Sequence, residues 1–124
     1  MAIILRLNNK ISSQNLVLDI RNKIDNGQID TWLYDKDGDF THSADQWKNK
    51  AWMSPNIFKS NPQFIVFGIL GRKGTDLSMD EYSIYHGRFT EMLLKQYSQY
   101  IVKLEVTTPK DERVSEYDTF NVNF

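Results

Sequence analysis

The sequence predicts an α+β fold, a two-layer sandwich in which a five- or six-stranded, mostly antiparallel sheet carries two main helices on one face. Three observations predict it: two segments have helical apolar periodicity, several short segments have strand patterns, and the two kinds alternate along the chain. Their order contains the β-α-β-β-α-β series of ferredoxin-like folds if a tryptophan-rich segment counts as an insertion. A length of 124 residues indicates one α+β domain over residues 1–124.

The first half of the chain begins with an apolar strand at residues 2–7. A helix over residues 13–26 follows, because Ser12 or Ser13 can cap its start and Gly27 can end it in the left-handed conformation. Two strands at residues 29–34 and 40–42 then flank the hairpin signal Asp37-Gly38. The apolar side of the helix repeats every four positions, at Leu16, Ile20 and Ile24.

The middle of the chain predicts a short helix over residues 43–53, because Ser43 and Gln46 have the spacing of a capping box. Pro55 would end this helix, and residues 56–62 would form a surface connection. The apolar run at residues 64–70 lacks alternation, which is typical of a central strand covered on both faces. Residues 71–77 are expected to form a loop.

The longest helix begins at the capping box of Ser78 and Glu81 and is expected to run to about Tyr97. Two strands at residues 100–107 and 119–124 close the chain, and the polar connection 109–117 would let them pair as a hairpin. One stripe of the helix must face the core, at Tyr82, Tyr85, Phe89, Met92 and Leu93. In the first of these two strands, one face is expected to carry Val102, Leu104 and Val106.

The bulk composition removes several classes of function. A formal net charge of −1 gives no general attraction to nucleic acid or to an anionic membrane, and no apolar run is long enough to span a bilayer. The absence of cysteine excludes disulfides and thiolate chemistry. The first six residues are too short for a signal peptide, so we expect a cytoplasmic protein. The bias toward Lys, Asn and Ile suggests an AT-rich bacterial or phage genome.

An acidic turn and three tryptophans form the first candidate binding region. Asp35, Asp37 and Asp39 alternate as calcium ligands do, but the glycine comes fourth and position twelve is Gln46, so an EF-hand is excluded. The aspartates are better suited to a tight turn, and neither a metal nor a cofactor is predicted. All three tryptophans lie nearby, and any that stays exposed could anchor a partner: Trp32, Trp47 and Trp52.

A second candidate surface lies on the long helix, where Ser83, Gly87 and Thr90 cluster opposite the core stripe. A glycine inside a helix costs about 1 kcal/mol relative to alanine. Gly87 therefore either admits a closely packed partner or is simply tolerated on an exposed face.

A catalytic alternative uses the two histidines. His42 and His86 could act as general acid and base on a phosphoester such as RNA, with Arg88 stabilising the phosphate. Both positions are also common ones for hydrogen-bonded structural histidines.

The leading hypothesis is a non-catalytic domain of inhibitor or immunity type that binds a protein with a basic surface and acts by steric blockade. Its binding residues would be the acidic hairpin, the exposed tryptophans and the Ser83/Gly87/Thr90 face. The alternatives are the metal-independent hydrolase and a structural subunit of a homo-oligomer, joined by that face or by the terminal strand as a sheet edge.

Overall fold

The computed structural model describes residues 2–109 and 121–122. Its main feature is a six-stranded sheet in the order β2-β3-β4-β5-β1-β7, in which every neighbouring pair is antiparallel. The predicted α+β fold is therefore confirmed. The strands are β1 (Ile3–Leu7), β2 (Trp32–Tyr34), β3 (Phe40–His42), β4 (Ala51–Phe58), β5 (Asn61–Gly71) and β7 (Ile101–Val106).

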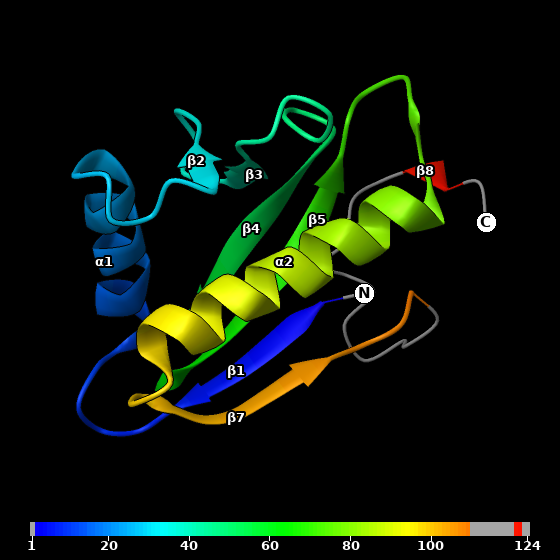
Figure 1. Cartoon of the computed structure of the whole chain (residues 1–124). Helices are drawn as coiled ribbons and strands as arrows, with labels where there is room; N and C mark the ends of the chain where they lie inside the picture. The colour runs from blue at the N-terminus through cyan, green and yellow to red at the C-terminus, as the bar shows by residue number, and fades with distance from the viewer. Residues whose placement is uncertain (1, 110–120, 123–124) are drawn as a thin grey trace.

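The strand order matches the ferredoxin-like series with one addition. The elements β1, α1 (Ser13–Asp25), β4, β5, α2 (Met79–Tyr97) and β7 follow the β-α-β-β-α-β series, and their strands lie in the order β4-β5-β1-β7. The β2–β3 hairpin is inserted between α1 and β4 and extends the sheet beside β4. Figure 1 shows α2 lying across the sheet and α1 next to this hairpin.

The core lies between the two helices and one face of the sheet. Leu5 of β1, Phe67 of β5 and Met53 of β4 are buried there with the apolar sides of both helices. Ser78 caps α2 as predicted, since its hydroxyl accepts the Glu81 backbone N–H while the Glu81 carboxylate accepts the Ser78 N–H. No helix in the described residues has the length and apolar character needed to cross a membrane. The predicted stripe of α2 is buried at Tyr82, Tyr85, Phe89, Met92 and Leu93.

The predicted short helix at residues 43–53 is wrong. The Ser43 hydroxyl donates to the Asp30 carbonyl instead of capping a helix, and Asn49 adopts a left-handed φ of 60° that ends a turn. The chain then runs as β4, which pairs with β5 over residues expected to form the end of that helix and a surface connection. Pro55 is tolerated within β4 because β3 pairs with β4 only at Phe40 and Met53, so that, among the described residues, no strand pairs with this edge from Ser54 onward.

Two expectations about the end of the chain also need correction. Val102 is 64% exposed, because an extra residue in β7 opposite Arg6 and Leu7 forms a bulge and brings Ile101 to the core side in its place. The last described strand, β8 (Asn121–Val122), pairs in parallel with β6 (Asp76–Leu77) and not with β7. Residues 119–120 and 123–124 of the predicted terminal strand lie outside the described residues.

Candidate functional site

The turn between β2 and β3 brings three carboxylates together. Asp35 Oδ1 accepts the backbone N–H groups of Asp37 and Asp39, each at 3.0 Å. Carboxylate oxygens of all three aspartates lie within 4.8 Å of one another. The aspartates therefore serve the tight turn, as the sequence indicated, and they also concentrate negative charge at its surface.

Arg21 of α1 holds this turn in place. Its guanidinium donates a hydrogen bond of 3.0 Å to the Gly38 carbonyl, and its central carbon lies 5.9 Å from the centroid of the Phe40 ring. Gly38 has a φ of +85°, and a side chain at this position would overlap the Arg21 guanidinium. The turn thus requires glycine for its backbone conformation, and a side chain at this position would also displace the Arg21 guanidinium.

A groove with a volume of about 380 Å³ lies between α1, the hairpin and the free edge of β4. Leu18 of α1 and Ile57 of β4 are 46% and 44% exposed, although both are large aliphatic residues. The groove thus combines an apolar rim with an acidic end. Its walls are formed by Val17, Leu18, Arg21, Asp37, Asp39, Ser54 and Ile57, among others.

The acidic end of the groove is electrostatically crowded. Partial burial raises the pKa of the Asp39 carboxyl above its usual value, and the neighbouring charges of Asp35 and Asp37 raise it further. A hydrogen bond with Ser54 and the charge of Arg21 act in the opposite direction. The ionised form of Asp39 is therefore less favourable in the folded protein than in water.

The three tryptophans do not form one surface. Trp32 is 0% exposed and makes edge-to-face contacts with His42, Tyr85 and Phe89, so it belongs to the core. Trp47 is half-buried against the core, and its carbonyl accepts the Tyr85 hydroxyl. Trp52 is also half-buried and alternates with buried Ala51 and Met53, so it faces the opposite side of the sheet. None of them lines the groove.

The small-residue face of α2 is open in the part of the chain that the structure describes. Ser83 and Gly87 are exposed and Thr90 is half-buried. A Cβ added to Gly87 would meet no atom within 4 Å, so no described element needs the glycine for close approach. Leu94, on the same side, is 46% exposed.

The histidines are both engaged in local structure. His42 Nδ1 accepts the Ala44 backbone N–H at 3.1 Å, and burial, with a smaller effect of Arg88, lowers the pKa of His42. His86 is 1% exposed, lies 2.8 Å through Nδ1 from the Tyr82 carbonyl, and stacks on the Tyr82 ring. Among the described residues, the groove and the two smaller cavities are not lined by His42, His86 or Arg88.

Sequence reasoning singled out Asp37 and Asp39 among the lining residues of the groove and missed the other seven: Gln14, Val17, Leu18, Arg21, Ser54, Pro55 and Ile57. One signal was available for Leu18, which lies two positions from Leu16 and so falls off the apolar stripe of α1. Ser54 and Ile57 carried no such signal, because Ser54 was predicted to lie at the end of the short helix and Ile57 in a surface connection. Arg21 could be recognised only after α1 was placed against the hairpin.

Comparison of the chain with protein-family models, with curated proteins and with solved structures gives no match. Function must therefore be argued from the geometry of the site itself.

Proposed function

We propose that this protein works by binding another protein through the groove between α1, the acidic hairpin and β4. The observation that carries the proposal is that two exposed aliphatic side chains, Leu18 and Ile57, flank the same hollow that Asp37 and Asp39 line. Apolar anchors beside charged rim groups are the usual composition of a protein-binding site. The described walls of the groove contain two carboxylates but no imidazole.

The partner would present a basic surface to the acidic turn, and the mode of action would be steric blockade, as in an inhibitor or immunity protein. We place this activity in the cytoplasm. The half-buried Trp47 and Trp52 lie outside the groove and would at most extend the contact.

Affinity capture from the native host, followed by calorimetry with the purified partner, tests the proposal. The bait variant Leu18→Ser/Ile57→Ser removes both apolar anchors from the surface. We expect it to weaken binding by about tenfold or more, since losing a hot-spot side chain costs at least ~1–2 kcal/mol.

Leu94→Ser is the matched control, because Leu94 is also a helix-surface leucine with 46% exposure. It should bind like the wild type. If Leu94→Ser abolishes binding and the double variant does not, the interface is the Ser83/Gly87/Thr90 face, and the proposed groove is wrong.

A further inference from the structure

The hairpin carboxylates differ in what already satisfies them. Asp35 Oδ1 accepts two backbone N–H groups and so is committed to the turn. Asp37 and Asp39 are the two that line the groove. Any ligand in the groove therefore meets two carboxylates, with a third within 4.8 Å adding to the negative potential.

This negative charge is only partly offset by Arg21, which lines the same groove. In residues 2–109 and 121–122, no lysine or arginine forms an ion pair with Asp35, Asp37 or Asp39. Arg21 is nearby, but its guanidinium is directed to the Gly38 carbonyl and the Phe40 ring. Three carboxylates beside one guanidinium still repel one another, and an incoming cation would reduce that repulsion.

The apolar walls define the shape of that cation. Leu18 on α1 and Ile57 on β4 lie on different walls, and Val17 adds buried apolar surface beneath Leu18 on the same helix. Lysine and arginine bury their methylene stems on such surfaces while the charged head stays with acceptors. A volume of about 380 Å³ is at the small end of the range for ligand pockets, ~300–1,000 Å³.

We propose that the groove receives a lysine or arginine side chain of the protein partner, with its stem between Leu18 and Ile57 and its head between Asp37 and Asp39. The inference rests on the proposed protein-binding function and adds the chemistry of the contact. The partner segment carries the basic residue next to aliphatic ones, which cover the exposed parts of Leu18 and Ile57.

A divalent cation fits the same carboxylates less well. Calcium takes about six to eight oxygen ligands, and magnesium needs near-octahedral geometry. The described residues offer three carboxylates here, and one oxygen of Asp35 is already used by two N–H groups. A bare metal ion also has no use for the aliphatic walls.

The test is a titration followed by the backbone amide signals of the protein in two-dimensional NMR. The probe is the peptide acetyl-Leu-Arg-Leu-amide, and its control has citrulline, which has nearly the same shape but no charge, in place of arginine. We expect saturable shifts at Leu18, Asp37, Gly38 and Ile57 with the arginine peptide. The citrulline peptide should bind about tenfold more weakly, because a hydrogen bond from a neutral side chain to a carboxylate is weaker than one from a charged guanidinium.

The variant Asp37→Asn/Asp39→Asn keeps the side-chain shapes and removes both charges, and it should lose the preference for arginine. Asp30→Asn/Asp45→Asn removes the same charge from exposed positions elsewhere and should keep it. Equal binding of the two peptides would overturn the inference. So would tighter binding of Ca²⁺ alone at the same amides, or shifts that depend on protein concentration and therefore report a second copy of the chain.

The outcomes also separate this inference from the proposed function. If Leu18→Ser/Ile57→Ser loses the captured partner but the arginine peptide causes no shifts, the groove is an interface and the basic-residue inference is wrong. If the peptide binds but the partner is still captured by Leu18→Ser/Ile57→Ser, the groove holds cations and the proposed interface is wrong.

Discussion

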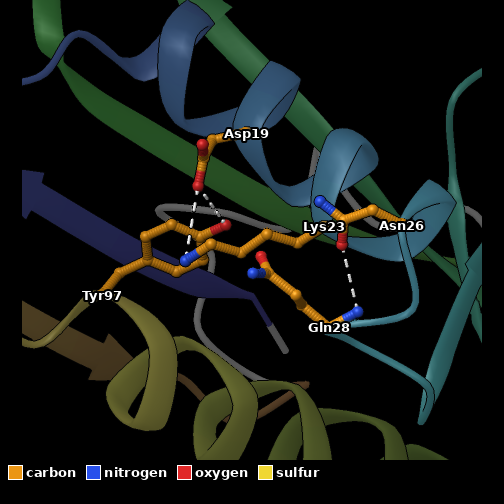
Figure 2. Close-up of polar contacts among 5 residues, drawn as sticks. All are labelled: Asp19, Lys23, Asn26, Gln28 and Tyr97. Atoms are coloured by element: carbon orange, nitrogen blue, oxygen red, sulfur yellow. Dashed lines mark hydrogen bonds and ion pairs between the residues drawn. The ribbon is translucent and has the colours of Figure 1, made fainter.

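The hydroxyl of Tyr97, at the end of α2, donates a hydrogen bond of 2.8 Å to Asp19 Oδ2 of α1. Lys23 Nζ lies 3.5 Å from the same oxygen and 4.4 Å from the centroid of the Tyr97 ring (Figure 2). Burial and the bond to Asp19 raise the pKa of Tyr97 above its usual range. This contact joins the two helices, and it also fixes the helix whose outer side forms a wall of the groove.

Removing the hydroxyl with Tyr97→Phe should lower the free energy of unfolding by about 1 kcal/mol, the typical net value of such a bond. The ring remains to fill the core. A double-mutant cycle with Asp19→Ala, measured by urea unfolding, isolates the pair. A coupling energy indistinguishable from zero would show that the bond does not stabilise the helix pair.

Gly38→Ala should destabilise the protein more than Gly27→Ala. Both glycines have a positive φ, of +85° and +82°, so both variants carry the backbone strain of about 1–2 kcal/mol. Only the Gly38 side chain would meet Arg21, since a Cβ at Gly27 meets nothing within 4 Å. Urea unfolding of the two variants measures the difference between their losses of stability. Equal losses would show that the Arg21 side chain moves aside without cost.

His42 should make stability depend on pH. Its pKa is lowered in the folded protein, so the stability it contributes is present above the unfolded value of 6.5 and is lost as the pH falls below it. His42→Asn keeps an acceptor for the Ala44 N–H and does not titrate. The free energy of unfolding should therefore decline less from pH 7 to pH 5 in the variant than in the wild type. Urea unfolding at each pH measures this decline. Parallel profiles for variant and wild type would contradict this origin.

Gly87→Ala should stabilise the protein by about 1 kcal/mol, because it removes the helix penalty of glycine and the new methyl group meets no atom within 4 Å. Thermal unfolding measures this gain. Partner binding by the same variant is the control: unchanged affinity agrees with the groove as the interface, and a loss would assign the contact to this face of α2.

Asp39→Asn should stabilise the protein at pH 7 by about 0.5 kcal/mol, the size of a like-charge repulsion between neighbouring side chains. The raised pKa of Asp39 means that stability is highest when the carboxyl is protonated, below the unfolded value of 3.8, and is lost as the pH rises through the folded value. The advantage of the variant should thus vanish in acid. Urea unfolding of the variant and the wild type at pH 7 and pH 3 measures the two free energies of unfolding. Urea is used because it is uncharged and does not screen the carboxylates.

The parts of the fold that were predicted correctly depend on local patterns. Both main helices have their caps and apolar stripes within their own sequence, and Asp37-Gly38 marks its own hairpin. The start of β4 was predicted wrongly because Ser43 and Gln46 have the spacing of a helix cap. In the structure the Ser43 hydroxyl instead bonds to the carbonyl of Asp30, thirteen positions away. Pro55 strengthened the error, since its place at a free edge is visible only in the sheet.

The candidate site was predicted only in part, for a related reason. Asp35, Asp37 and Asp39 cluster through hydrogen bonds within five residues, which sequence spacing can reveal. Their relation to Arg21 spans seventeen positions and depends on how α1 rests on the hairpin. Trp32 illustrates the reverse case, because its burial is decided by distant residues of α2.

Strand length controls access to the acidic turn. β3 has three residues and β4 has eight, so the hairpin covers only the first part of its neighbour and leaves a notch in the sheet beside α1. Pro55 lies at this uncovered edge and offers no N–H to a longer hairpin. Lengthening both arms of the hairpin would fill the notch without changing a single carboxylate, so the proposed partner site would be blocked by its shape alone while the charges remained.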